Sequence, residues 1–260
     1  MIKEYIYTLF SILRIIKNCH IPTCFNLRNS GSNRILRILG NGKSLNENTF
    51  QVNPQIDYMV VNRHVLSDTY GSIKPLFYVI ADPFFFTHKK GLSVLKQINN
   101  KTSWRMYLCV PFSHENRILL KEMIQNTNIQ IKFYNTCSFV GINRVAYYLY
   151  KHQLSMPVLQ NVLVACIMLG IYMQYLQIEL YGVEHTWTKY LSVHDDNLVY
   201  LENPHFFDKE PVDSKPLKDI QLTNEYPFFL ILENYSRMFR SYWEIKNFLK
   251  QTNLKVQIVH

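Results

Sequence analysis

Histidines with carboxylate neighbours occur in the second half of the chain, where they could act as general bases. His185 directly follows Glu184, and His194 precedes two aspartates. His205 lies in the segment ENPHFFD. An imidazole titrates near neutral pH, so it can take a proton from a hydroxyl, and a neighbouring carboxylate can orient it. We expect His185 to be the base because a strand would anchor it. His194 and His205 stand in a predicted lid loop and are alternatives, as is Glu184.

The same residue types could bind a metal ion or simply form turns. The segment VHDD contains Asp195 and Asp196, but aspartate is also a common turn residue. The five cysteines show no paired CxxC spacing, which favours buried thiols of a cytosolic protein. We therefore expect no metal and no cofactor.

A second set of candidate residues lies where predicted strands end. The strand RILRIL (34–39) runs into a glycine loop, DYMVVN (57–62) ends in a polar pair, and LFYVIAD (76–82) ends in an aspartate. These strand ends supply Gly40, Asn41, Gly42, Ser44, Asn62, Arg63 and Asp82. Glycines there would permit positive φ and let a phosphate or sugar approach the backbone. GNGKSL lacks the third glycine of a dinucleotide fingerprint, and its lysine is misplaced for a P-loop, so an ordinary turn also fits.

Strands alternate with helices along the chain, which predicts a mostly parallel sheet covered on both faces. Further strands are expected at 105–110, 129–134, 176–182 and 254–259, and helices at 94–98, 115–124, 157–173 and 235–253. The helix at 157–173 opens with a proline and is apolar almost all round, so we expect it at the centre of the domain. Ligands of such sheets bind outside the carboxyl ends of the strands.

The first 30 residues predict a basic amphipathic helix and a linker ahead of a single domain at 31–260. Apolar residues recur at helical spacing beside Lys3, Arg14 and Lys17, and the stretch is too short and too charged to span a bilayer. Docking on a membrane surface, packing on the domain and packing against another subunit all remain open. The net charge of +9 favours polyanions, but no nucleic-acid-binding motif is present, so we expect no nucleic acid partner.

Taken together, the motifs GNGKSLNE, VNRHVLSDTYG and FYVIADPFFF resemble the start of bacterial sialyltransferases of glycosyltransferase family 42. The segment LQNVLVACIMLGIYMQYLQIELYGVEHTW is similar to a broader group from surface-polysaccharide clusters, related to 6-hydroxymethylpterin diphosphokinases. The resemblance covers roughly residues 35–260. It implies a Rossmann-like α/β fold of the variant glycosyltransferase-A type, preceded here by the amphipathic helix.

By this resemblance, the nucleotide-sugar donor would contact Asn41 and Asn62, with Asp82 lining the site. The segment before the central helix would approach the donor phosphate, and it contains Ser155, Gln160 and Asn161. The family uses no metal. It places its catalytic histidine shortly before the last helix, whereas the counterpart here, ENYSRMF, has an arginine and no histidine. Arg63 or Arg144 would then stabilise the departing phosphate.

The sequence therefore predicts a metal-independent glycosyltransferase with a nucleotide-sugar donor and a glycan or glycolipid acceptor. The acceptor would be a growing lipopolysaccharide or capsule chain. The protein would be cytoplasmic and peripheral at the inner membrane, held to the anionic membrane surface by its N-terminal helix. One alternative is a pterin-type pyrophosphokinase with Mg²⁺ on Asp195 and Asp196. Another is a non-catalytic nucleotide-binding scaffold of a polysaccharide assembly complex.

Overall fold

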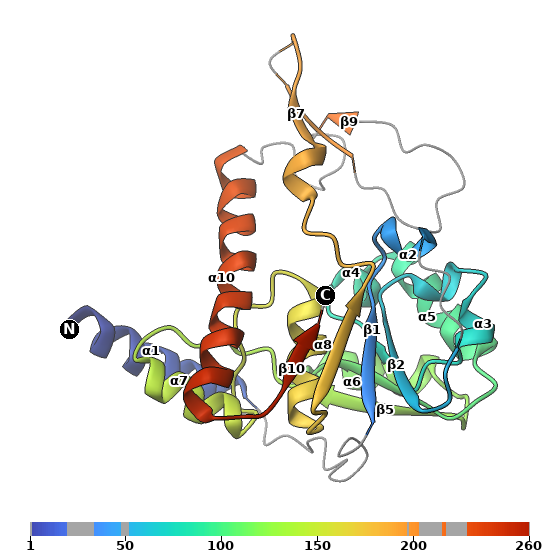
Figure 1. The fold of residues 1–260 in the computed structure, drawn as a ribbon, viewed down its shortest axis with the longest axis horizontal. Coiled ribbons are helices and arrows are strands. Elements are labelled where there is room, and N and C mark those ends of the chain that lie inside the picture. The colour runs from blue at the N-terminus through green and yellow to red at the C-terminus, as the bar shows by residue number, and fades with distance from the viewer. Residues whose placement is uncertain are drawn as a thin grey trace.

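The computed structural model describes residues 2–19, 34–47, 52–196, 198–202, 215–216 and 228–259. At its centre lies a seven-stranded sheet in which every neighbouring pair of strands is parallel (Figure 1). Its strands are β1 (Ile35–Leu39), β2 (Ile56–Val61), β3 (Phe77–Val79), β4 (Met106–Pro111), β5 (Ile129–Tyr134), β6 (Gln177–Tyr181) and β10 (Gln257–Val259). The predicted Rossmann-like α/β class is confirmed, and all seven predicted strands are present.

Helices pack on both faces of this sheet. The helices among the described residues are α1 (Ile2–Asn18), α2 (Ser44–Glu47), α3 (Tyr70–Ile73), α4 (Phe84–Thr87), α5 (Lys89–Lys101), α6 (His114–Met123), α7 (Asn143–Lys151), α8 (Val162–Tyr172) and α10 (Phe228–Thr252), with 3₁₀ turns η1 (His64–Leu66) and η2 (Trp187–Tyr190). One core cluster joins α7, α8 and α10 to one face of the sheet, and a second joins α3, α4, α5 and α6 to the other. None of the described helices is long and apolar enough to cross a membrane.

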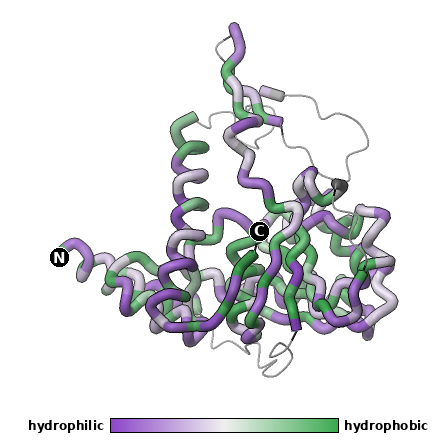
Figure 2. The backbone as a smooth tube through the Cα atoms, viewed as in Figure 1, coloured by the Kyte–Doolittle hydropathy of each residue, from purple (hydrophilic) through white to green (hydrophobic). Residues whose placement is uncertain are grey.

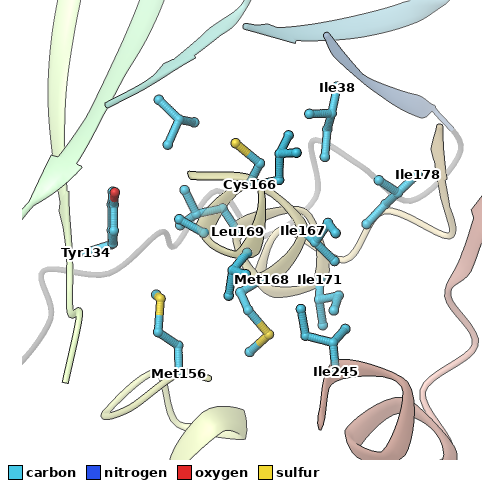
Figure 3. Packing of buried hydrophobic residues seen from close by; sticks show 14 of the residues in the cluster. Ile38, Tyr134, Met156, Cys166, Ile167, Met168, Leu169, Ile171, Ile178 and Ile245 are labelled. Atoms are coloured by element: carbon cyan, nitrogen blue, oxygen red, sulfur yellow. The ribbon is translucent and has the colours of Figure 1, made fainter. Parts of the chain in front are cut away.

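Helix α8 occupies the centre of the first cluster, as its all-round apolar sequence predicts. Every residue from Leu163 to Ile171 is buried, and Figure 3 shows side chains from strands and other helices surrounding it. Gly170 lies close to the sheet, since a Cβ there would come within 2.8 Å of Leu36 and Ile178 side-chain atoms. The helix thus forms the inner layer against which the sheet packs.

Several predicted boundaries are wrong. Helix α8 begins at Val162, because the side chain of Asn161 caps it, and Pro157 lies outside the helix. The strand predicted at 76–82 has three residues, and the last helix begins at Phe228. Helix α7 was not predicted. A small antiparallel sheet, β7 (Leu191–Val193), β8 (Val199–Leu201) and β9 (Lys215–Pro216), lies in the segment interpreted as a lid loop.

The strand order β10-β6-β1-β2-β3-β4-β5 contains a reversal of direction. The chain builds outward from β1 to β5 and then returns to place β6 on the other side of β1. In open parallel sheets, the crevice for a ligand opens at such a switch point, outside the carboxyl ends of the strands. The topology therefore predicts a ligand crevice at the carboxyl ends of β1 and β6.

Candidate functional site

A pocket of about 440 Å³ lies at the carboxyl ends of β1 and β6. Its walls come from the glycine loop after β1, the end of β2, the amino end of α8, the loop after β6, and the segment that contains η2. Four separate stretches of the chain thus meet at the switch point, since the loop after β6 continues into the segment with η2. They bring together Gly40, Asn41, Gly42, Ser44, Asn62, Asn161 and Glu184 among the residues predicted from the sequence.

The glycine loop packs directly on the backbone of the loop after β6. The amides of Gly40 and Gly42 donate hydrogen bonds to the carbonyls of Tyr181 and Gly182, at 2.8 and 2.9 Å. A Cβ on Gly40 would collide with the carbonyl oxygen of Gly182. The expectation of positive φ is wrong for both loop glycines; among the described glycines, only Gly141 and Gly182 have it. Close approach of two backbones is therefore the reason for glycine at 40.

The Glu184 carboxylate lies over this loop and inside the pocket. Its Oε1 accepts a 2.7 Å hydrogen bond from the amide of Ser44, and its Oε2 occupies the space where a Cβ of Gly42 would be. The carboxylate therefore fixes the loop, and its remaining lone pairs lie at the pocket wall. Among the predicted catalytic residues that the structure describes, Glu184 alone lines the pocket.

Two asparagine side chains present buried amide oxygens at this site. Oδ1 of Asn41 and Oδ1 of Asn62 have no hydrogen-bond partner, although both atoms are buried. Asn62 has a φ of 50°, a left-handed conformation that asparagine tolerates. The backbone amide of Asn62 donates to the Val79 carbonyl at 3.1 Å, and its backbone carbonyl accepts from the Tyr78 hydroxyl at 2.7 Å. A buried acceptor without a donor destabilises the protein, so these two oxygens suit a ligand that supplies N–H or O–H groups.

The amino end of α8 and two lysines give the pocket positive charge. Asn161 caps the helix by accepting from the amide of Leu163 at 2.8 Å, and both residues line the pocket. The first turn of an 11-residue helix carries partial positive charge that favours an anion. Lys43 and Lys189 also line the pocket. Neither lysine was predicted: Lys43 does not fit the P-loop pattern, and Lys189 lies in the 3₁₀ turn η2, which has no periodic signal in the sequence.

The two histidine candidates that the structure describes, His185 and His194, do not line the pocket. The ring of His185 packs on α10, with centroids 4.7 Å from Tyr242 and 6.0 Å from Phe239. His194 is exposed in the β7–β8 hairpin, where it stacks on Tyr200 at 3.8 Å and pairs with the Ser192 hydroxyl at 3.0 Å. His205 lies outside the described residues.

Other predicted donor residues also lie outside this pocket. The Arg63 guanidinium stacks over the Phe84 ring, and the exposed Asp82 side chain accepts from the Phe84 backbone amide at the start of α4. Ser155 is buried, and its hydroxyl donates to the Cys137 carbonyl at 2.7 Å. Gln160 is exposed just before the helix cap. Arg144, named as a possible phosphate ligand, lies on α7.

The aspartate pair shapes a turn. Asp196 accepts from the Leu198 amide and from the Tyr200 hydroxyl, each at 2.9 Å, which uses both its oxygens within the hairpin. Within the described part of the chain, no group of three or more His, Cys, Asp or Glu side chains is placed to hold a metal ion. The turn interpretation therefore accounts for Asp196.

Comparisons with known proteins give a likeness of fold. No protein-family model matches the chain, and no curated protein sequence matches it. Among solved structures it is similar to the monofunctional alpha-2,3-sialyltransferase Cst-I from Campylobacter jejuni, with 14% identity over 92% of this chain and 78% of that chain and a TM-score of 0.45. It is also similar to the sialyltransferase CstII of that organism, described in complex with a substrate analogue, cytidine-5'-monophosphate. There the identity is 16% over 78% of this chain and 99% of that chain, and the TM-score is 0.33.

Neither of these two structures is a 6-hydroxymethylpterin diphosphokinase, so that part of the sequence resemblance has no support. Similarity at this level supports no conclusion about chemistry. A function must therefore be argued from the residues of the pocket.

Proposed function

We propose that the protein is a glycosyltransferase that binds a nucleotide-sugar donor in the pocket between β1 and β6. The observation that carries this proposal is the pair of buried, unpartnered oxygens of Asn41 and Asn62 beside the amino end of α8. A nucleotide sugar has the complementary groups: hydroxyl and amino donors at its ends and anionic phosphate between them. The motifs that resemble family 42 sialyltransferases include both asparagines.

In this arrangement, the phosphates lie at the amino end of α8, near Lys43 and Lys189. Both lysines and the helix end line the pocket, and together they stabilise negative charge that grows on the leaving phosphate. The asparagine oxygens accept from hydroxyl or amino groups of the donor. No metal is included in this proposal, because two cations and the helix end supply positive charge.

Glu184 is the group we propose as base. It lines the pocket, whereas His185 packs on α10. The acceptor hydroxyl gives its proton to the free lone pair of the Glu184 carboxylate, and its oxygen bonds to the anomeric carbon. The bond from that carbon to the phosphate oxygen breaks, and the nucleotide leaves with the electron pair.

The acceptor we propose is a lipopolysaccharide or capsular glycan met at the inner membrane face. The support for this acceptor is helix α1, whose basic and exposed apolar side chains suit contact with an anionic membrane. The proposal names the class of donor, a nucleotide sugar, and specifies neither its sugar nor its nucleotide base.

Donor binding is tested by thermal shift with purified protein and CMP-, UDP-, GDP- and dTDP-sugars. One nucleotide class should raise the melting temperature, and the same donor should be hydrolysed slowly in the absence of acceptor. Consumption of ATP instead would establish the pyrophosphokinase. Nucleotide binding without any turnover would establish the scaffold.

Two variants test the asparagine oxygens directly. Asn41→Ala and Asn62→Gly should each weaken donor binding by about tenfold or more, since each removes an acceptor for a donor group. Glycine is chosen at 62 because it tolerates the left-handed backbone, so the variant removes only the carboxamide. The matched control is Asn143→Ala on α7, an exposed asparagine outside the pocket. Unchanged affinity in both pocket variants would contradict the proposed site.

The role of Glu184 is separated by two substitutions. Glu184→Gln keeps an oxygen to accept from Ser44 but cannot take a proton at neutral pH, and it should lower single-turnover transfer by about 100-fold or more. Glu184→Ala also releases the glycine loop and should in addition weaken donor binding. If Glu184→Gln transfers at the wild-type rate, Glu184 is a positioning residue only. His185 should then be tested as the base with the variant His185→Phe, which keeps a ring against Tyr242.

A further inference from the structure

We propose that α1 docks the protein on an anionic membrane by inserting its outward apolar face at the level of the lipid headgroups. This extends the proposed function, because a lipid-linked acceptor would be met at that surface. Its test requires no turnover, so it can fail or succeed independently of the chemistry.

Helix α1 is attached to the rest of the protein through the side that carries Thr8 and Ser11, where Ile15 also packs into the core. The Ser11 hydroxyl donates to the carbonyl of Val140 at 2.8 Å and accepts from the Val140 amide at 3.0 Å. The Thr8 hydroxyl accepts from the amide of Ile142 at 2.9 Å. Gly141, with a φ of 146°, lies against Thr8, and a Cβ there would collide with Thr8 atoms. The loop before α7 is therefore shaped to receive this side of α1.

The attachment leaves most of the apolar side uncovered. Thr8, Ser11 and Ile15 are the buried residues of the helix, whereas large exposed side chains are Ile2, Tyr5, Ile6, Tyr7, Leu9, Phe10, Leu13 and Ile16. Ile2, Ile16 and Phe10 are 79%, 73% and 66% exposed. At 100° per residue, all but Tyr7 fall within an arc of about 140°. Figures 1 and 2 show α1 at the edge of the molecule, with hydrophobic residues along it.

Charge decides between a lipid surface and a second copy of the chain. Lys17 falls within the apolar arc, and Lys3 at its edge, on the helical wheel. In a symmetric pairing of two α1 helices, these lysines would face their own copies, with Glu4 as the helix's only acidic residue. Like charges at such a contact oppose association. Anionic headgroups instead complement lysines that extend from an inserted helix.

Further positive charge lies on neighbouring helices. Arg144 and Lys151 of α7 line a hollow of about 430 Å³ against the end of α10, and no acidic residue lines it. In Figure 1, α7 lies beside α1. The exposed ring of Tyr148 also lines this hollow. Amphipathic rings and basic side chains are typical of surfaces that face lipid headgroups.

The experiment is co-sedimentation of the full chain with vesicles of phosphatidylcholine alone and with added phosphatidylglycerol. The wild type should bind the anionic vesicles, less tightly as salt rises. The variant Leu9→Gln/Leu13→Gln, altered at two exposed positions, should bind at least about tenfold more weakly. The charge variant Lys3→Gln/Lys17→Gln should lose mainly the preference for anionic lipid. The thermal shift by the sugar nucleotide should stay unchanged in both variants.

Insertion is separated from surface adsorption by the variant Phe10→Trp. Lipids brominated along the acyl chain should quench this variant more than the wild type, whose three tryptophans give the background, if the helix enters the bilayer. Three results would each overturn the proposal. They are wild type that does not bind anionic vesicles at low salt, Leu9→Gln/Leu13→Gln that binds like wild type, and Phe10→Trp that is quenched no more than wild type. A concentration-dependent dimer abolished by Leu9→Gln/Leu13→Gln, in protein that leaves vesicles unbound, would instead make this face a subunit contact.

Discussion

Helices α8 and α1 are both rich in apolar residues, yet they bury opposite kinds of surface. In α8 the buried stretch is apolar on every side, whereas α1 buries Thr8 and Ser11 beside Ile15 and exposes Ile2, Ile6, Leu9, Leu13 and Ile16. The difference lies in the surface that each helix meets. Helix α8 packs on apolar side chains of the strands. Helix α1 instead meets the loop at 138–142, whose backbone N–H and C=O groups need hydrogen bonds. The partner surface, more than apolar content, determines which side of a helix turns inward.

A buried charge should give the largest contrast between the two helices. Ala165→Asp places a carboxylate at a fully buried position of α8 and should lower the free energy of unfolding by about 4 kcal/mol or more. The matched Leu9→Asp in α1 should change it by about 0.5 kcal/mol or less, because Leu9 is exposed. Urea denaturation followed by circular dichroism measures both. Equal destabilisation would show that α1 buries its apolar side in solution.

The second largest contrast is expected in the reactivity of cysteine thiols near α1 and in α8. A hydrogen bond with Cys19 and the charge of Arg14 lower the pKa of Cys137, where α1 meets the body, to about 7. Burial raises the pKa of Cys166 in α8 well above its usual value. Because the thiolate is the reactive form, alkylation of Cys137 should rise with pH and reach half its maximum near pH 7. Cys166 should react at least about 100-fold more slowly, since it needs unfolding to be reached.

Rates for each cysteine are measured separately by mass spectrometry after alkylation across pH 5.5 to 9. Cys19→Ala removes the hydrogen bond, so it should raise the pKa of Cys137 and move its profile to higher pH. A profile that stays in place would mean that Cys19 does not stabilise the thiolate.

Loss of single polar contacts should give the smallest effects. Asn161→Ala removes the cap of α8 and should lower the global free energy of unfolding by about 1 kcal/mol. Ser11→Ala removes two hydrogen bonds that attach α1, and it should speed hydrogen exchange in α1 while the denaturation midpoint stays unchanged. If Ser11→Ala lowers the midpoint as much as Asn161→Ala, α1 unfolds together with the core.

Periodicity and strand-end chemistry were sufficient to predict the sheet, the buried central helix and part of the pocket. Asn41 and Asn62 could be placed together because parallel strands end at one edge. The direction of the His185 side chain could not be predicted, since it depends on packing against Tyr242 of α10. Nor could the position of Glu184, whose contact with Ser44 joins residues 140 positions apart. Contacts of this range leave no periodic signal in a sequence.

The joining of the glycine loop to the loop after β6 also has a consequence for the order of folding. A chain that has formed β1 to β5 still lacks one wall of the pocket, because Gly182 and Glu184 come about 140 residues after Gly40 and Ser44. Closing so long a segment is a slow, non-local step. A ligand of this pocket therefore binds only chains that have completed that step, and it shifts the folding equilibrium toward them by mass action.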